Sequence, residues 1–367
     1  MSTKPLGVGF AGCGNISTRY AASLRTKPEL VRIVAAYDPV RAAAQALANA
    51  GTEGVRVHAA LEDLLADPDV DLVINLTYTA AHFPVTKQAL LAGKHVHSEK
   101  PLSSTSKQAL ELVKLAKRKR LRLGCSPFTW MGELQQTAWK ALREGKLGTV
   151  RMAYAEMNWA RIESWHPNPA PFYVQGAGPV FDVGVYPLTV LTTFFGPVKR
   201  VTGFGRTLLP KRKVQAGPNA GKPFKVQTPD WALGMLEFAK GGLLARLTAS
   251  FYVRTISQHG IELHGDKGTL YLPSAHNFEP ELKYQGVADK EAVALPHVRP
   301  PHQGVEWGRA IFDMAEAIRA KRPHGATGEQ AAHVVEICEG ILKSAASGRA
   351  VTLKSRFKPP QPLPWAR

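Results

Sequence analysis

The sequence predicts two domains: a doubly wound, parallel α/β domain and then an α+β domain with a large, mostly antiparallel open sheet. Over residues 1–126, short apolar runs alternate with amphipathic segments, as in a parallel sheet covered by helices on both faces. From residue 127 onward, longer segments alternate apolar and polar residues, with hairpin signals at Gly241-Gly242 and Asp266-Lys267-Gly268. We therefore expect domains at residues 1–126 and 127–367.

Each domain has a predicted order of elements. In the first, we expect strands at Leu6–Ala11, Val31–Tyr37, Val55–Ala59, Leu72–Leu76, His95–Ser98 and Leu121–Cys125, and helices at Arg41–Asn49, Val85–Leu91 and Thr105–Lys119. In the second, we expect helices at Glu133–Glu144, Pro179–Phe195, Val305–Lys321 and Glu329–Ser347, a strand at Val150–Trp159, further strands within Arg200–Pro273, and an extended tail from Lys358 to Arg367.

Composition excludes several classes of protein. The chain has 367 residues and a net charge of +18, but no nucleic-acid motif accompanies the basic clusters, so we expect no nucleic-acid partner. The three cysteines lack the spacing of a zinc site or redox dithiol, and we expect no metal. No apolar run is long enough for a membrane helix, and the first residues do not resemble a signal peptide. We expect a cytoplasmic protein without a membrane partner.

A glycine-rich turn follows the first predicted strand. Its sequence is Gly12-Cys13-Gly14-Asn15-Ile16-Ser17. In a dinucleotide-binding turn of the Rossmann type, the first glycine permits a tight turn and the second lets the backbone approach a pyrophosphate. The amides of the following helix then face the phosphates. A glycine turn without a ligand is the alternative, but the strand before the turn favours dinucleotide binding.

Asp38 ends the second predicted strand, where a carboxylate can bond the two ribose hydroxyls of adenosine. Because an acid repels a 2′-phosphate, Asp38 favours NAD, although nearby Arg41 leaves NADP possible. The alternative, which is compatible with the first, is a helix N-cap before Pro39.

The tripeptide Glu99-Lys100-Pro101 ends the fifth strand. Ligands of open α/β sheets bind at the carboxyl ends of strands, where the Lys100 ammonium can stabilise an alkoxide. The alternative is a solvated lysine at the end of a strand.

Asp182 and Tyr186 lie four residues apart in the predicted helix Pro179–Phe195, so they share a face with Thr189 and Thr193. Apolar residues flank this polar stripe, so the helix is expected to be buried with its stripe toward a polar cavity. The alternative is a core tyrosine with a bonded hydroxyl and an aspartate that acts as a local cap.

These motifs, in this order, resemble the glucose–fructose oxidoreductase/inositol dehydrogenase (Gfo/Idh/MocA) family over nearly the whole chain. The resemblance implies a Rossmann domain, a second domain whose open sheet builds homodimers or homotetramers, and redox chemistry on sugars, polyols or related compounds with NAD or NADP.

The resemblance also assigns residues. Lys100 matches the catalytic lysine, Asp182 the carboxylate that orients it or its neighbour, and Tyr186 the acid/base position. The residues implied at the cofactor are Gly12, Gly14, Asn15, Ile16, Asp38, Thr77, His82, Glu99 and Lys100. Tyr78-Thr79 departs from the usual Pro-Asn. Trp159, Arg161, Trp165 and His166 line the sugar site in this interpretation; loop anchors are the alternative.

The expected mechanism is proton removal by Tyr186 while hydride leaves the adjacent carbon for the nicotinamide. An unperturbed tyrosine is protonated at neutral pH, so the Lys100 ammonium would have to lower its pKa. Two other functions stay open: an NAD-dependent glycoside hydrolase that forms a transient keto-sugar, and a non-catalytic sensor of NAD or sugar.

Overall fold

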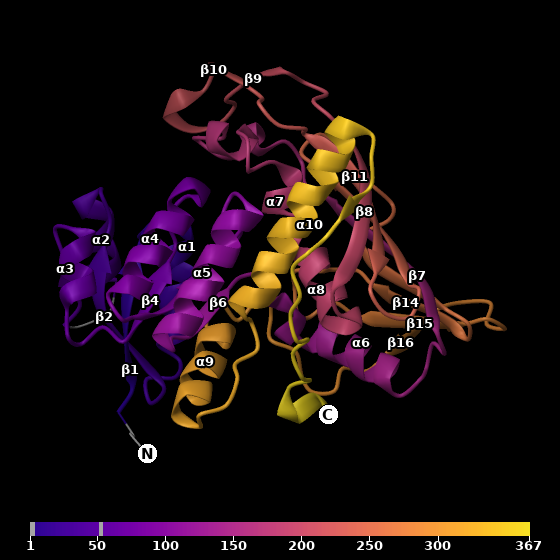
Figure 1. The fold of residues 1–367 in the computed structure, drawn as a ribbon, viewed down its shortest axis with the longest axis horizontal. Coiled ribbons are helices and arrows are strands. Elements are labelled where there is room, and N and C mark those ends of the chain that lie inside the picture. Colours follow the sequence, from indigo (N-terminus) through magenta and orange to yellow (C-terminus); the bar gives the residue numbers. More distant parts are fainter. Residues whose placement is uncertain (1–3, 51–53) are drawn as a thin grey trace. The chain divides into compact units, whose positions relative to one another are not determined.

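The computed structural model describes residues 4–50 and 54–367, and the chain divides into two compact units (Figure 1). The first unit comprises Met1–Phe128 and Glu306–Ala332, and the second comprises Thr129–Val305 and His333–Arg367. No helix in the described ranges is long and apolar enough to cross a membrane.

The first unit contains the predicted parallel sheet. Its strands are β1 (Leu6–Ala11), β2 (Val31–Tyr37), β3 (Arg56–Val57), β4 (Leu72–Asn75), β5 (His95–Ser98) and β6 (Leu123–Cys125). In the described part of the chain they pair in the order β3-β2-β1-β4-β5-β6, and all neighbours are parallel. The order reverses between β1 and β4, which makes the carboxyl ends of these strands the expected ligand edge.

The helices of this unit are α1 (Asn15–Leu24), α2 (Arg41–Asn49), α3 (Leu61–Ala66), α4 (Thr79–Leu91), α5 (Ser106–Lys119) and α9 (Arg309–Arg319). Helices α2, α5 and α9 begin and end close to the predicted residues, whereas α4 begins at Thr79, six residues before the predicted Val85. Thr105, the first residue of the predicted helix Thr105–Lys119, is the N-cap of α5, because its Oγ1 accepts from the Gln108 amide at 3.3 Å. Helix α3 was not predicted from the sequence.

Helix α9 lies in the first unit, although we expected it in the second domain. The reason is its contacts: the Gly308 amide donates to Ser23 Oγ at 2.8 Å, and the rings of Trp307 and Tyr20 lie 5.5 Å apart. At the other end of the helix, Arg319 donates to the Glu29 carbonyl at 2.6 Å.

The second unit contains a mixed, mostly antiparallel sheet. Its strands are β7 (Val150–Asn158), β8 (Val198–Arg206), β11 (Trp231–Phe238), β12 (Leu244–Ser250), β13 (Gly260–Gly265), β14 (Gly268–Leu272), β15 (Leu282–Gly286), β16 (Val293–Leu295) and β17 (Val351–Thr352). Among the described residues the order is β16-β15-β14-β13-β7-β12-β11-β8-β17. Both predicted hairpins are confirmed, at β11–β12 and β13–β14. The prediction of a mostly antiparallel sheet is confirmed, and among the described strands of this sheet the exception is the pair β12 and β7, which is parallel.

Shorter elements complete this unit. The helices are α6 (Glu133–Arg143), α7 (Pro179–Asp182), α8 (Val185–Phe195) and α10 (Gly328–Ser347, which begins in the first unit), with single turns η1 (Thr129–Met131), η2 (Ile162–Ser164), η3 (Ala170–Tyr173), η4 (Gly217–Asn219) and η5 (Pro364–Ala366). A two-stranded ribbon, β9 (Lys211–Lys213) and β10 (Pro223–Lys225), lies in the basic segment between β8 and β11.

The prediction of one helix over Pro179–Phe195 is wrong, because the chain breaks at Val183 and Gly184 between α7 and α8. Pro187 explains the break. Proline has no amide to donate to the carbonyl four residues earlier, which is that of Val183, and its ring would clash with that carbonyl in a continuous helix.

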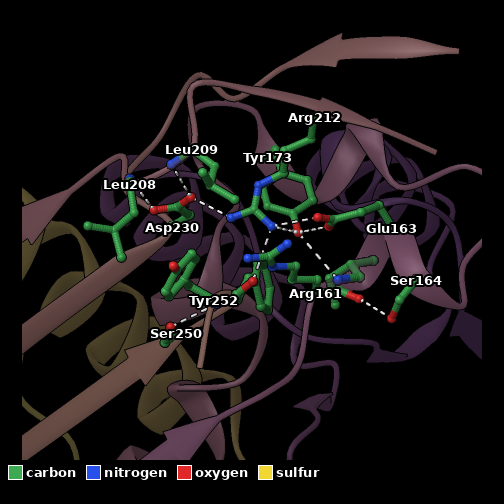
Figure 2. A network of polar contacts seen from close by, with 12 residues as sticks. Arg161, Glu163, Ser164, Tyr173, Leu208, Leu209, Arg212, Asp230, Ser250 and Tyr252 are labelled. Carbon is green, nitrogen blue, oxygen red and sulfur yellow. Dashed lines mark hydrogen bonds and ion pairs between the residues drawn. The ribbon is translucent and has the colours of Figure 1, made fainter. Parts of the chain in front are cut away.

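A buried ion cluster holds the segment between β7 and α7 (Figure 2). The Arg212 side chain, on β9, is 1% exposed and lies 2.8 Å from Glu163 Oε1. Its other terminal nitrogen pairs with Asp230, at the start of β11. The Tyr173 hydroxyl donates to Glu163 Oε2 at 2.6 Å. Burial raises the pKa of Tyr173, and the bond to Glu163 reinforces this, so the hydroxyl keeps the proton that it donates.

This ion cluster connects segments that are distant in the sequence. Asp230 also accepts from the amides of Leu208 and Leu209, and Arg212 donates to the Phe251 carbonyl at 3.2 Å. The cluster therefore ties η2, η3, β9 and the ends of β11 and β12 to one guanidinium. Because buried carboxylates without a cation are strongly unfavourable, the position of the whole segment depends on Arg212.

We predict that Arg212→Met lowers the free energy of unfolding by about 3–5 kcal/mol, because Glu163 and Asp230 lose their buried cation. The neighbouring Lys213 is exposed, so Lys213→Met should change this free energy by less than about 0.5 kcal/mol. Urea unfolding followed by tryptophan fluorescence measures the effect in the second unit, which contains every tryptophan except Trp307. Equal stability of the two variants would show that the cluster is not a structural anchor.

Candidate active site

The glycine turn lies at the carboxyl end of β1, as predicted. Gly12 has φ +94°, and a Cβ there would lie 2.8 Å from the Leu76 carbonyl. Gly14 is the N-cap residue of α1 and makes no side-chain cap, and a Cβ at Gly14 would meet nothing within 4 Å. Ser17 is buried and donates to the Gly14 carbonyl at 2.6 Å. The turn thus leaves space beside the first amides of α1, those of Asn15 and Ile16, which have no acceptor inside the helix. It fits a dinucleotide pyrophosphate.

Asp38 connects the end of β2 to the glycine turn. Its Oδ2 accepts from the Cys13 amide and its Oδ1 from the Val40 amide, both at 2.8 Å. The N-cap alternative is wrong, because the N-cap of α2 is Val40 and the helix begins at Arg41. A carboxylate held beside the turn can still accept from ribose hydroxyls, since each oxygen has a second lone pair.

The residues after β4 and β5 are joined by His82. This side chain is buried, with Nδ1 2.6 Å from the Pro101 carbonyl oxygen and Nε2 2.9 Å from the Thr77 carbonyl oxygen. Burial lowers the pKa of His82, and the two hydrogen bonds partly offset this effect. Both ring nitrogens therefore face protein backbone, so His82 holds the two loops together and is not placed to contact a cofactor.

Glu99 and Asn75 support the backbone of Lys100. Glu99 Oε1 accepts from the Tyr20 hydroxyl at 2.6 Å, and Oε2 accepts from the Lys100 amide at 3.0 Å. The Glu99 amide donates to the Asn75 carbonyl at 2.8 Å, and Asn75 Oδ1 accepts from the Thr77 hydroxyl at 2.6 Å. The Glu99 carboxylate thus serves the scaffold, while Lys100 follows it at the carboxyl end of β5.

In the second unit, Asp182 and Tyr186 stand on either side of the break between α7 and α8. Tyr186 is 9% exposed, and its ring packs edge-on against His276, with centroids 4.9 Å apart. Thr189 and Thr193 on α8 are buried. Tyr186, Thr189 and Thr193 thus all lie in a buried part of α8, as the sequence predicted for this segment.

The four residues expected at the sugar occupy the segment after β7. Trp159 and Trp165 are 39% and 49% exposed, whereas Arg161 and His166 are partly buried. Burial lowers the pKa of His166, and the negative charge of Asp182 partly offsets this shift. His166 is therefore close enough to Asp182 to sense its charge, which brings this segment and α7 into one neighbourhood.

Sequence reasoning missed His276, Tyr252 and the ion cluster. His276 Nδ1 lies 2.7 Å from Asn277 Oδ1, and the His276 and Asn277 amides donate to Ser274 Oγ. These residues follow β14 in an irregular segment, where no periodicity marks them. Tyr252 follows β12 by two residues; a polar aromatic residue after an apolar strand was the available signal.

Comparison with known proteins agrees with this geometry. Residues 6–126 match the family model described as "Oxidoreductase family, NAD-binding Rossmann fold" (GFO/IDH/MocA), and residues 135–271 match the model of the GFO/IDH/MocA C-terminal domain.

Individual proteins are also similar to this chain. An uncharacterized oxidoreductase of Schizosaccharomyces pombe is 32% identical over 182 residues, which cover 49% of this chain and 48% of that protein. The dTDP-3,4-didehydro-2,6-dideoxy-alpha-D-glucose 3-reductase of Streptomyces violaceoruber is 28% identical over 363 residues, 92% of this chain and 98% of the reductase. A levoglucosan dehydrogenase solved with NADH and L-sorbose has a TM-score of 0.83 at 20% identity, over 95% of this chain and 99% of that one.

Both family models match the chain, and the strand order of the parallel sheet, with the glycine turn where that order reverses, is that of a dinucleotide-binding domain. The chain belongs to the GFO/IDH/MocA family of NAD-binding oxidoreductases.

Proposed function

We propose that the protein transfers hydride between NAD and a CH–OH or C=O carbon of a sugar, polyol or related small molecule. The observation that carries the proposal is the position of Lys100. It follows β5 on the same sheet edge as the glycine turn, and its backbone is fixed by Glu99. The names of two relatives, the sugar-nucleotide reductase of Streptomyces violaceoruber and a D-xylose dehydrogenase of Paenarthrobacter nicotinovorans, support a carbohydrate substrate.

The residues at the carboxyl ends of β1 and β2 would hold the cofactor. The turn from Gly12 to Gly14 and the first amides of α1 would bind the pyrophosphate. Asp38 would accept from the adenosine ribose, and its charge disfavours a 2′-phosphate, so NAD is proposed over NADP. When bound, the nicotinamide supplies the hydride acceptor or donor.

Tyr186 is the proposed acid/base group. Its phenolic oxygen takes the proton of the substrate hydroxyl during oxidation and returns it during reduction. The Lys100 ammonium favours the phenolate and the developing alkoxide, and Asp182 orients these groups. Lys100 belongs to the first unit and the other two residues to the second, so their meeting at the substrate is part of the proposal. Trp159, Trp165 and His166 are the proposed sugar contacts.

We also propose assembly into a homodimer or homotetramer through the open face of the large sheet. On one face, Gly203 and Gly234 leave room for Ile341 of α10. Side chains alternate along a strand, so Phe204 and Met235 point to the other face, where they are 71% and 37% exposed. Exposed aromatic and methionine side chains favour an interface on this face.

We predict that Gly14→Ala raises the dissociation constant of NADH about tenfold or more, because the new methyl group would occupy the space proposed for the pyrophosphate. Fluorescence titration with NADH measures this. Thermal unfolding without cofactor is the control and should be nearly unchanged, since nothing in the protein lies within 4 Å of the added Cβ. Wild-type affinity in a stably folded variant would contradict cofactor binding at this turn.

We predict that Tyr186→Phe lowers kcat by about 10²–10⁴-fold, because it removes the proton-accepting oxygen and keeps the ring that packs on His276. Lys100→Met should lower kcat comparably. Nicotinamide reduction with a panel of sugars and polyols measures turnover, and NADH titration shows whether the variants still bind cofactor.

Undiminished turnover by either variant would contradict the assigned roles. A nitrophenyl glycoside tests the alternative chemistry: release of sugar without accumulation of NADH would identify a glycoside hydrolase instead of a dehydrogenase.

A further inference from the structure

The parallel pair in the second unit brings Arg161 and Tyr252 together. Strands β7 and β12 end in register, with Asn158 opposite Ser250, and the Trp159 amide donates to the Ser250 carbonyl at 2.8 Å. The chain segments that leave these strands therefore start side by side. Arg161 follows Asn158 by three residues and Tyr252 follows Ser250 by two, and the Arg161 guanidinium carbon lies 5.0 Å from the centre of the Tyr252 ring (Figure 2).

The Arg161 guanidinium lacks an internal counterion. In the described part of the chain, no carboxylate forms an ion pair with it, and its buried Nε has no hydrogen-bond partner. The nearest acid along the chain, Glu163, is already bound by Arg212 and Tyr173. By contrast, Arg246 on β12 pairs with Glu156 at 2.9 Å. A partly buried guanidinium stacked on a ring and lacking an acid is suited to an external oxyanion.

This guanidinium lies next to the proposed substrate site. Ile162, Val183 and Phe251 pack in one buried cluster, and each is the direct neighbour in sequence of Arg161, Asp182 or Tyr252. Exposed aromatic rings stand nearby, since Trp159 is 39% and Tyr252 38% exposed. Aromatic faces with a single convergent charge are typical of a site for a small polar ligand.

We propose that Arg161 binds an anionic group of the substrate, a carboxylate or a phosphate ester, and that the protein acts on acidic sugars. Two parallel N–H donors of a guanidinium match two oxygens of either group. The ion cluster around Arg212 keeps the backbone of this segment in place, so that Arg161 is presented by a rigid support. The inference rests on the proposed function, because it assigns a subsite to that same active site.

The test compares acidic sugars with their neutral parents. The pairs are D-glucuronate and D-glucose, D-galacturonate and D-galactose, and D-glucose 6-phosphate and D-glucose, each assayed with NAD for the wild type, Arg161→Gln, Arg161→Lys and Arg254→Gln. Arg254 is the matched control, because it is exposed and lies two residues after Tyr252.

We expect the wild type to have at least about a tenfold higher kcat/KM for the acidic member of a pair. Arg161→Gln should lose about tenfold or more of that value through a higher KM, with a change below about threefold for the neutral sugar. Arg161→Lys should recover part of the loss. Arg254→Gln, the control, should keep the wild-type kcat/KM for both members of a pair. A preference for uronates identifies a carboxylate subsite, and a preference for the phosphate ester identifies a phosphate subsite.

Two outcomes would overturn the inference: a wild type that prefers neutral sugars, or an Arg161→Gln variant that loses acidic and neutral substrates equally. The second would mean that Arg161 only balances the excess negative charge of Glu163 and Asp230. Calorimetric binding of the same sugars to the NADH-loaded protein separates this inference from the proposed function. If no sugar is oxidised, the proposed function fails. In that case, weaker binding of acidic sugars to Arg161→Gln than to the wild type still supports the anion subsite. Unchanged binding of acidic sugars to Arg161→Gln rejects the subsite.

Discussion

Parallel strand pairing is the constraint on which the candidate site depends, because it places the carboxyl ends of neighbouring strands on one edge. In the first unit, the glycine turn, Asp38 and Lys100 follow β1, β2 and β5 directly. In the second unit, Arg161 and Tyr252 follow β7 and β12, the pair that departs from the antiparallel pattern. Antiparallel neighbours would have sent these segments toward opposite edges. Each unit thus uses parallel pairing to collect polar side chains from segments far apart in the sequence.

Hydrogen bonds and ion pairs fix the loops that follow these parallel strands. In the first unit, the Glu99 carboxylate accepts from the Tyr20 hydroxyl and the Lys100 amide. The two ring nitrogens of His82 lie against two backbone carbonyls. In the second unit, Arg212 plays the same part with buried ions. His82 and Arg212 are buried, so the loss of a hydrogen-bond or ion-pair partner there would be costly in stability. The backbone of Lys100 is fixed by Glu99, and the backbone next to Arg161 is fixed by the Arg212 cluster. The side chains of these two residues are therefore not needed to hold their own loops in place.

The sequence predicted features that depend on local pattern. The apolar strands of the first unit, the helix that follows Thr105 and the glycine turn were all found in the structure, because each follows from the conformational preferences of a few neighbouring residues. Pro187 was a local signal for the break before α8, but the apolar pattern on both sides concealed it. Asp182 and Tyr186 consequently lie on two different helices, α7 and α8, and not on the face of one helix as predicted.

Other features depend on contacts between segments that are far apart in the sequence. Local sequence patterns do not predict such contacts. Arg212 pairs with acids 49 and 18 positions away, and the basic segment around it reads as solvated. The assignment of α9 to the first unit rests on contacts such as Gly308 with Ser23, 285 positions apart. The parallel pairing of β7 with β12 is of the same kind, because alternation of apolar and polar residues does not specify strand direction.

In the proposed enzyme, residues that local sequence patterns predict carry the reaction, and residues that long-range contacts position select the substrate. The turn, Lys100 and Tyr186 occupy positions that local sequence specifies, and they carry a reaction that any CH–OH substrate requires. Trp159 and Arg161 follow β7 and Tyr252 follows β12, and the Arg212 cluster anchors these two segments through Glu163 and the Phe251 carbonyl. Replacing Trp159, Arg161 or Tyr252 leaves the buried ions and the reacting groups unchanged. In the proposed enzyme, side chains outside the anchoring cluster would therefore set the choice of substrate, and the charge of Arg161 would favour acidic sugars.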